Sequence, residues 1–327
     1  MAPRRSRLGP ALFFGALAVA SLGILSRADA AFGPARVHTP RAPRLSLARP
    51  STSAHGRSRA VRMVTALPST PVSIPLELST SPEGLRYEWV PVGSLAGVAV
   101  PRPLAGPIFA PAAPGFYHLA ILDGDERRVV DSLTVGVLTP MSAKRGISIN
   151  GYRIGFYAGE RRGDLDAAPP GFLEVRAVDV TLPVSEHLTI EDFITHDEQT
   201  TWPRYVAMDP RLLDKLELVF EEIARFRGER GAEVDVDVHS GFRTPLHNRR
   251  VPRAAGDSRH QYGDAADVAV DANGDGRVTW VDISLIERAV ERVEREHPDL
   301  VGGLGVYRGG SPYAHIDVRG RRARWRA

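Results

Sequence analysis

The sequence predicts an all-β sandwich domain followed by a mixed α+β domain. Between residues 71 and 141, short β-prone runs alternate with turns rich in proline and glycine, which is typical of a sandwich. After residue 141, amphipathic helical patterns are interspersed with short alternating strands, which indicates an α+β domain. A chain of 327 residues, with 43% apolar and 25% charged residues, is long enough to form both.

The first 30 residues have the pattern of a secretory signal peptide. Three arginines precede an apolar run over residues 8–25, and Ala28-Asp-Ala30 supplies small residues for cleavage. We therefore expect export to the periplasm, the cell envelope or the medium. An uncleaved anchor is the alternative, but glycines and a proline shorten the run below the roughly 20 residues of a stable membrane span. The chain has no cysteine, so it must fold without disulfides.

Residues 31–70 are predicted to be a disordered linker. They are rich in proline, serine, alanine and arginine and contain no acidic residue. Lys144 and Lys215 are the only lysines of the chain, so arginine carries nearly all of its positive charge. The net charge of +3 is modest, and no nucleic-acid partner is expected.

The predicted sandwich, residues 71–141, carries no recognisable chemistry. Residues 114–119 are similar to the late strands of an immunoglobulin-like module, and such a domain is more often a spacer or a docking module than a catalyst.

Residues 142–232 are interpreted as the N-terminal part of the catalytic region. Their clearest element is a helix from Pro210 to about Arg227, with Asp209 as N-cap and Gly228 as terminator. Six apolar residues form a stripe on this helix that should pack under a sheet: Leu212, Leu213, Leu216, Val219, Phe220 and Ile223. His187, at the start of a shorter helix, is expected to be structural.

The last segment, residues 233–327, contains the pattern of a metal site. His260 and Asp267 stand seven residues apart around the bend at Gly263, and each can donate one ligand atom to zinc. Alternation in the strand 313–319 puts His315 and Asp317 on one face. A catalytic zinc takes three protein ligands and keeps one open position, so His315 is the proposed third ligand.

Four blocks, at residues 240–244, 258–267, 302–307 and 315–317, occur in an order that resembles a family of bacterial cell-wall enzymes. These are the zinc D-alanyl-D-alanine carboxypeptidases and L-alanyl-D-glutamate endopeptidases, which share their metal fold with the hedgehog signalling domain. The resemblance implies a small antiparallel sheet with helices. It also implies that a zinc-activated water hydrolyses a peptide bond of a peptidoglycan stem peptide.

The resemblance also assigns substrate contacts. Arg243 would bind a substrate carboxylate bidentately, although a surface salt bridge is its alternative. Ser258 would hydrogen-bond the substrate backbone and, on an extended segment, face the same way as His260. Tyr307 would line the cleft or serve in packing. Asp264 is expected to be a solvent-facing loop carboxylate.

The general base is the weak point of the resemblance. Several branches of the family carry an acidic residue three positions before the last histidine, where this chain has Pro312. Asp317 is the remaining candidate, but it could instead orient a ligand histidine. His239 is an outside candidate. An inactive, zinc-bearing module that binds the cell wall is therefore the alternative function.

Residues 271–282 resemble the calcium loop of dockerins and EF-hands. Gly276 stands at the sharp-turn position, and the helix 283–296 follows. A terminal Asp in place of Glu, and an entering strand in place of a helix, favour a modest structural site; an Asx-rich turn without an ion is the alternative. The expected calcium ligands are Asp271, Asn273, Asp275, the Arg277 carbonyl, Thr279 and Asp282.

Overall fold

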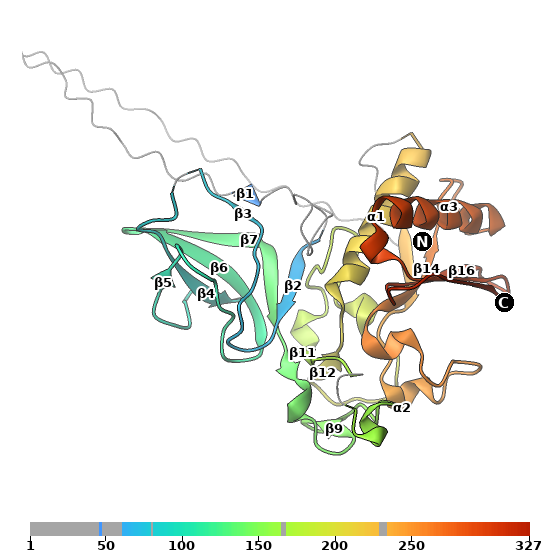
Figure 1. Ribbon diagram of the computed structural model, residues 1–327, viewed down its shortest axis with the longest axis horizontal. Coiled ribbons are helices and arrows are strands. Elements are labelled where there is room, and N and C mark those ends of the chain that lie inside the picture. The colour runs from blue at the N-terminus through green and yellow to red at the C-terminus, as the bar shows by residue number, and fades with distance from the viewer. Residues whose placement is uncertain (1–45, 48–60, 80, 165–167, 229–233) are drawn as a thin grey trace, which may run out of the picture. The chain divides into compact units, whose positions relative to one another are not determined.

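The computed structural model describes residues 46–47, 61–79, 81–164, 168–228 and 234–327 (Figure 1). The predicted signal peptide and most of the predicted linker lie outside these ranges. Within them, no helix combines the length and the apolar character that crossing a bilayer requires.

A five-stranded sheet forms the β-rich region, in the order β2-β7-β6-β4-β5. Its strands are β2 (Met63–Ala66), β4 (Arg86–Pro91), β5 (Arg102–Pro103), β6 (Gly115–Asp123) and β7 (Glu126–Val137). β6 and β7 form a hairpin whose turn contains Gly124 in the left-handed region (φ 56°). The short strands β1 (Ser46–Leu47) and β3 (Leu76–Glu77) form a separate antiparallel pair. The predicted immunoglobulin-like sandwich, which needs two facing sheets, is thus not confirmed over the described residues.

Strand β2 corrects the predicted linker boundary. It lies inside the segment 31–70, yet it pairs in parallel with β7, with Met63 opposite Thr134, and the Met63 side chain is fully buried. Composition alone could not reveal this strand, because its hydrogen bonds come from a partner about 70 residues further along the chain.

The described residues of the segment 139–206, which lies between the two larger sheets along the chain, form short elements. The antiparallel order β12-β11-β8 and the pair β9-β10 supply the strands. These are β8 (Thr139–Pro140), β9 (Ser148–Ile149), β10 (Tyr152–Arg153), β11 (Gly171–Val175) and β12 (Arg204–Val206). The 3-10 turns are η1 (Met141–Ala143), η2 (Glu160–Arg162), η3 (Ala177–Asp179) and η4 (Glu191–Phe193).

A second five-stranded sheet, in the order β13-β14-β16-β15-β17, forms the centre of the C-terminal region. Its strands are β13 (Val236–Ser240), β14 (Ala265–Val270), β15 (Gly303–Tyr307), β16 (Tyr313–Asp317) and β17 (Ala323–Arg326). All neighbours are antiparallel except β15 and β17. A small, mostly antiparallel sheet with few helices confirms the α+β class of this region.

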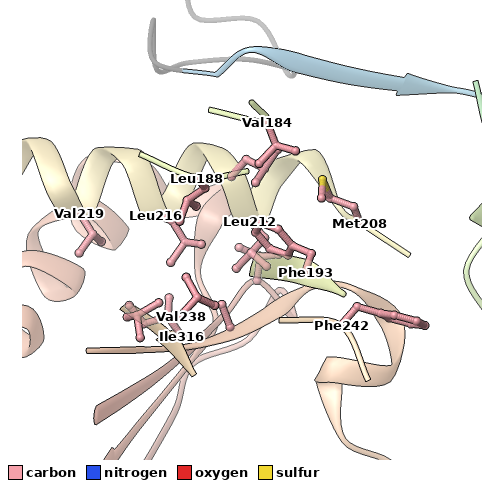
Figure 2. Close-up of a cluster of buried hydrophobic side chains, with 14 of the residues drawn as sticks. Val184, Leu188, Phe193, Met208, Leu212, Leu216, Val219, Val238, Phe242 and Ile316 are labelled. Atoms are coloured by element: carbon pink, nitrogen blue, oxygen red, sulfur yellow. The ribbon is translucent and has the colours of Figure 1, made fainter. Parts of the chain in front are cut away.

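Helices α1 (Pro210–Phe226) and α3 (Trp280–Glu296) pack against each other and against one face of this sheet (Figure 1). The Asp209 side chain caps α1 by accepting a hydrogen bond from the Arg211 amide, and Gly228 follows its end with φ 75°. The six predicted stripe residues of α1 are all buried, as expected. Figure 2 shows Leu212, Leu216 and Val219 directed toward Val238 and Ile316 of the strands.

The remaining helical pieces carry the site loops. They are α2 (Pro245–Asn248), η5 (Arg259–Tyr262) and η6 (Pro298–Leu300). Because apolar side chains fill the helix-covered face of the sheet, the polar residues of the strands occupy its opposite face.

Candidate metal centre

Strands β14 and β16 place the two sheet-borne ligands side by side. Asp267 and His315 are direct partners in the antiparallel register. Alternation sends their side chains to the face opposite Ile316 and Val318, as the sequence predicted. His260 comes from η5, just before β14. The chain turns between them at Gly263 (φ 72°), where a Cβ would collide with the Ala207 carbonyl.

Three ligand atoms meet in a triangle. His260 Nε2 lies 3.1 Å from Asp267 Oδ1 and 3.0 Å from His315 Nδ1, and Asp267 Oδ1 lies 2.9 Å from His315 Nδ1. All three side chains are buried. Among the described residues, this is the only group of three or more His, Cys, Asp or Glu whose ligand atoms lie within 4.8 Å of one another.

In each imidazole, the nitrogen that points away from the triangle has a hydrogen-bond acceptor, and this acceptor fixes the tautomer of the ring. His260 Nδ1 lies 2.7 Å from the Gly241 carbonyl oxygen, which can only accept a hydrogen bond, so Nδ1 carries a hydrogen. His315 Nε2 lies 3.1 Å from an Asp317 carboxylate oxygen and donates to it in the same way. In the neutral rings, His260 Nε2 and His315 Nδ1 therefore both present lone pairs to each other and to the Asp267 carboxylate.

Such a convergence of lone pairs requires a positive charge between them. Either one imidazole takes up a proton or a cation binds all three atoms. Tetrahedral zinc with ligands at 2.0–2.2 Å has ligand–ligand edges of roughly 3.3 Å, close to the observed triangle. The donor set and its spacing thus fit zinc, and three protein ligands leave a fourth position free.

The pKa values of the triad reflect the same crowding. Burial lowers the pKa of His260 below its ordinary value, which favours the neutral, ligating form. Burial alone would raise the pKa of Asp267, but the neighbouring His260 and His315 outweigh it and hold that pKa well below its usual range. Burial opposes charging of His315 as well, yet its hydrogen bonds to Asp267 and Asp317 raise its pKa overall.

Asp317 is enclosed behind His315. Its fully buried carboxylate accepts hydrogen bonds from the Gly303 amide (2.6 Å), from Arg319 Nε (2.8 Å) and from His315 Nε2. Burial opposes its ionisation, but these donors hold the pKa of Asp317 well below its usual range. A Cβ at Gly303 would collide with the carboxylate, and one at Gly302 with the Asp317 backbone carbonyl. This close approach explains the Gly302-Gly303 pair.

Arg243 contacts a proposed zinc ligand. Its Nη2 donates to Asp267 Oδ2, the oxygen outside the triangle, and its Nε donates to Ser240 Oγ at 2.6 Å. The alternative of an ordinary surface salt bridge does not describe this contact, because Arg243 holds Asp267 with its other oxygen toward the histidines.

Two local expectations around His260 are wrong. Ser258 does not precede an extended segment: residues 259–262 form the 3-10 turn η5 with Ser258 as its N-cap residue, so the alternation that would align Ser258 with His260 is absent. Asp264 is buried and paired with Arg259. Burial raises the pKa of Asp264, and the Arg259 guanidinium opposes this shift.

An aromatic group adjoins His315 on the ligand face of the sheet. The centroids of the Trp325 and His315 rings lie 5.1 Å apart, and Trp325 Nε1 donates to Tyr307 Oη at 3.0 Å. Tyr307 in turn stacks on Tyr313 at 4.6 Å. Gly305 pairs with both His315 and Trp325, and the absence of a side chain there leaves room for the indole.

Tyr313 also belongs to this face, since it stands two residues before His315 in β16, although the sequence analysis did not single it out. The His239 ring lies 5.3 Å from Tyr313, and its Nε2 lies 3.2 Å from Asp237 Oδ2. His187 is not in the triad: its Nδ1 lies 2.7 Å from Glu217 Oε2 of α1, which agrees with the structural role expected for it.

Residues 271–282 do not bring their carboxylates together as the triad does. Asp271 accepts hydrogen bonds from the amides of Gly274, Asp275 and Gly276. Asp282 is fully buried and accepts from the Asn273 amide and from both the amide and the hydroxyl of Thr279. Thr279 and Asp282 thereby form the capping box of α3. The carboxylates of this loop form no converging group of three in the structure, so the predicted calcium site is not supported.

Comparison with protein-family models gives a match over part of the chain. The family model described as Peptidase M15 matches residues 186–281. The matched segment contains His260, Asp267, Arg243 and Ser258. It ends before His315, which the pairing of β16 with β14 brings beside Asp267. No curated protein and no solved structure shows significant similarity to the chain. The match and the triad together support the M15 zinc peptidase family, and with it a metallopeptidase.

Proposed function

We propose that the protein is an exported zinc-dependent peptidase that hydrolyses peptide bonds of peptidoglycan stem peptides, as a carboxypeptidase or an endopeptidase. The convergence of His260 Nε2, His315 Nδ1 and Asp267 Oδ1 carries this proposal. The M15 match over residues 186–281 supports the substrate class.

His260, Asp267 and His315 would hold the zinc ion. Zinc in such a site acts as a Lewis acid and lowers the pKa of a water molecule toward neutrality. The chain's own part is to fix the ligand set. Gly241 orients His260, Asp317 orients His315 and Arg243 orients Asp267, so each ligand has a partner on its far side.

Arg243 has a second role in this proposal. A guanidinium carries five N–H donors, and the contacts with Asp267 and Ser240 use two of its three nitrogens. The remaining donors are proposed to bind a carboxylate of the stem peptide. Ser258 and Tyr307 are proposed to contact the peptide beside the metal.

Asp317 is proposed to orient His315 rather than to accept the proton. A general base must reach the attacking water, whereas the Asp317 carboxylate is fully buried and bound by Gly303, Arg319 and His315.

His239 is the proposed proton acceptor. It lies at an irregularity in the β13–β14 register between Val238 and Ser240, and Ser240 is the register partner of Asp267. Irregularities of this kind redirect a side chain near an active site. The His239 side chain is partly exposed and packs against Tyr313.

Incubation of the purified protein with peptidoglycan tests the function. We expect release of D-alanine or of cleaved stem peptides, loss of this release in EDTA and in His260→Ala, and recovery of the wild-type protein with zinc. His239→Ala should keep its zinc and lose turnover. Binding of peptidoglycan without any product would instead establish an inactive, zinc-bearing wall-binding module, the alternative that Pro312 raises.

Export and the role of the β-rich region belong to the same proposal. The arginines and the apolar run of residues 1–30 favour a cleaved leader, and the N-terminal sheet would serve as a spacer or docking module. N-terminal sequencing of the protein recovered outside the cytoplasm should begin near Ala31. A start at Met1 or Ala2 would contradict cleavage.

A further inference from the structure

Lysine is rare in this chain, and both lysines are buried. Lysine and arginine together number 42, yet only Lys144 and Lys215 are lysines. The Lys215 side chain is fully buried, and Lys144 is 8% exposed. In a chain whose positive charge is otherwise carried by arginine, both lysines thus lie at interior positions.

Lys215 bridges the two helices and the ligand-bearing strand. From α1, its Nζ donates to Glu294 Oε1 of α3 at 2.7 Å and to the backbone carbonyl of Asp317 in β16 at 2.8 Å. The Gly302 amide donates to the same Glu294 Oε1 at 3.1 Å, and Arg324 Nη2 donates to the other carboxylate oxygen, Oε2. Burial lowers the pKa of Lys215, and the Glu294 carboxylate offsets part of this effect.

These contacts lead directly to the metal centre. The residue whose carbonyl Lys215 binds is Asp317, whose carboxylate orients His315, a proposed zinc ligand. Gly302 has no side chain, and a Cβ there would occupy the space next to this carbonyl. The order of contacts is therefore Glu294, Lys215, Asp317, His315.

An ammonium suits this position better than a guanidinium. It is compact, and its donors can rotate toward acceptors that are not coplanar, here a carboxylate oxygen and a carbonyl. A planar guanidinium is larger and needs acceptors arranged for its fork. A buried charge also costs free energy unless it is paired, which makes a purely incidental lysine here unfavourable.

We propose that Lys215 is a positioning residue of the metal centre: by holding the Asp317 backbone against Glu294, it fixes the carboxylate that orients His315 and thereby sets the affinity for zinc. This proposal rests on the zinc site that the proposed function assigns to the triad, and not on the peptidase activity. Lys215 lies on the helix-covered face of the sheet and would act on a metal centre on the opposite face.

Lys144 offers a matched control. Its Nζ also bonds one backbone carbonyl, that of Gly146 at 2.6 Å, and one carboxylate, that of Glu160 at 2.5 Å, but neither partner contacts the triad. Lys215→Met and Lys144→Met therefore remove equivalent buried ammonium groups. Only the first removal affects the support of Asp317.

The test measures the zinc dissociation constant by competition with a chromogenic chelator, and the visible spectrum of the cobalt-substituted protein. Loss of a partner behind a metal ligand typically weakens metal binding by about 10–100-fold. We expect Lys215→Met to weaken zinc binding by about tenfold and to change the cobalt spectrum. Lys144→Met should stay within about twofold of the wild type, even where both variants lose thermal stability. Equal effects of the two substitutions, or wild-type affinity in Lys215→Met, would overturn the proposal.

Lys215→Gln provides the same test if Lys215→Met does not fold. Its amide can still donate to the Asp317 carbonyl but carries no charge. We therefore expect a zinc affinity between those of Lys215→Met and the wild type, about fivefold weaker than the wild type. Unchanged affinity would contradict the proposal. The measurement is also independent of turnover. Tight zinc binding by a wild-type protein without peptidase activity would refute the proposed function and leave the role of Lys215 standing. A wild type that binds no zinc would refute both.

Discussion

The metal centre and the acidic loop at residues 271–282 both contain carboxylates at suggestive spacings, and they stand only four residues apart along the chain. In the metal centre, Asp267 is buried, and its Oδ1 lies 3.1 Å from His260 Nε2 and 2.9 Å from His315 Nδ1, two nitrogens that carry lone pairs in the neutral rings. In the loop, Asp271 and Asp282 accept hydrogen bonds from nearby amides and close a turn and a helix cap. The difference shows that the spacing of carboxylates along the chain does not by itself bring ligand atoms together; in the metal centre, the pairing of β14 with β16 does so.

Substituting one side chain in each region gives the clearest test of this difference. We expect His315→Ala to lose zinc and all metal-dependent activity, with an affinity loss greater than the roughly 100-fold that an outer partner can cost. Asp271→Ala should retain zinc and turnover. Metal analysis by mass spectrometry and the peptidoglycan assay measure both. Normal zinc content in His315→Ala would remove this histidine from the site.

Asp317→Asn should have the next largest effect. The amide can donate its NH₂ group to His315 Nε2, which would favour the tautomer that carries the hydrogen on Nδ1 and so leaves no lone pair on Nδ1 for zinc. A zinc affinity about 10–100-fold weaker is expected, as for other partners behind metal ligands. Competition with a chelator measures it. An unchanged affinity together with abolished turnover would instead identify Asp317 as the base.

Gly303→Ala should act through packing. The new Cβ would meet the Asp317 carboxylate, so the strand or the carboxylate must shift, at a cost of about 1–3 kcal/mol in the free energy of unfolding. Gly309→Ala is its control, since no heavy atom lies within 4 Å of a Cβ built at Gly309. Denaturant unfolding of both variants gives the comparison, and equal stability of the two would contradict the close approach at Gly303.

The smallest expected effect concerns the acidic loop. Asp282→Ala removes half of the capping box of α3 and should cost about 1 kcal/mol of stability. The loss should be the same in millimolar calcium and in EDTA, and calcium should not raise the melting temperature of the wild type. A calcium-dependent rise that disappears in Asp282→Ala would show that the loop binds the ion after all.

Sequence alone determined the features that depend on local periodicity and on residue chemistry. The apolar stripe of α1, its Asp209 cap and the face shared by His315 and Asp317 follow from patterns within a few residues. The sequence also named His260, Asp267 and His315 as the ligand set, but the pairing of β14 with β16 is what brings His315 beside the other two. The position of β2, the burial of Asp264, the contact between Arg243 and Asp267 and the enclosure of Asp317 were decided by the tertiary structure. Each of these depends on a partner that the chain brings in from another element, or on how tightly that partner closes around the group. Hydrogen-bond satisfaction and burial are set by such packed neighbours, and the pattern of a single strand or loop does not contain them.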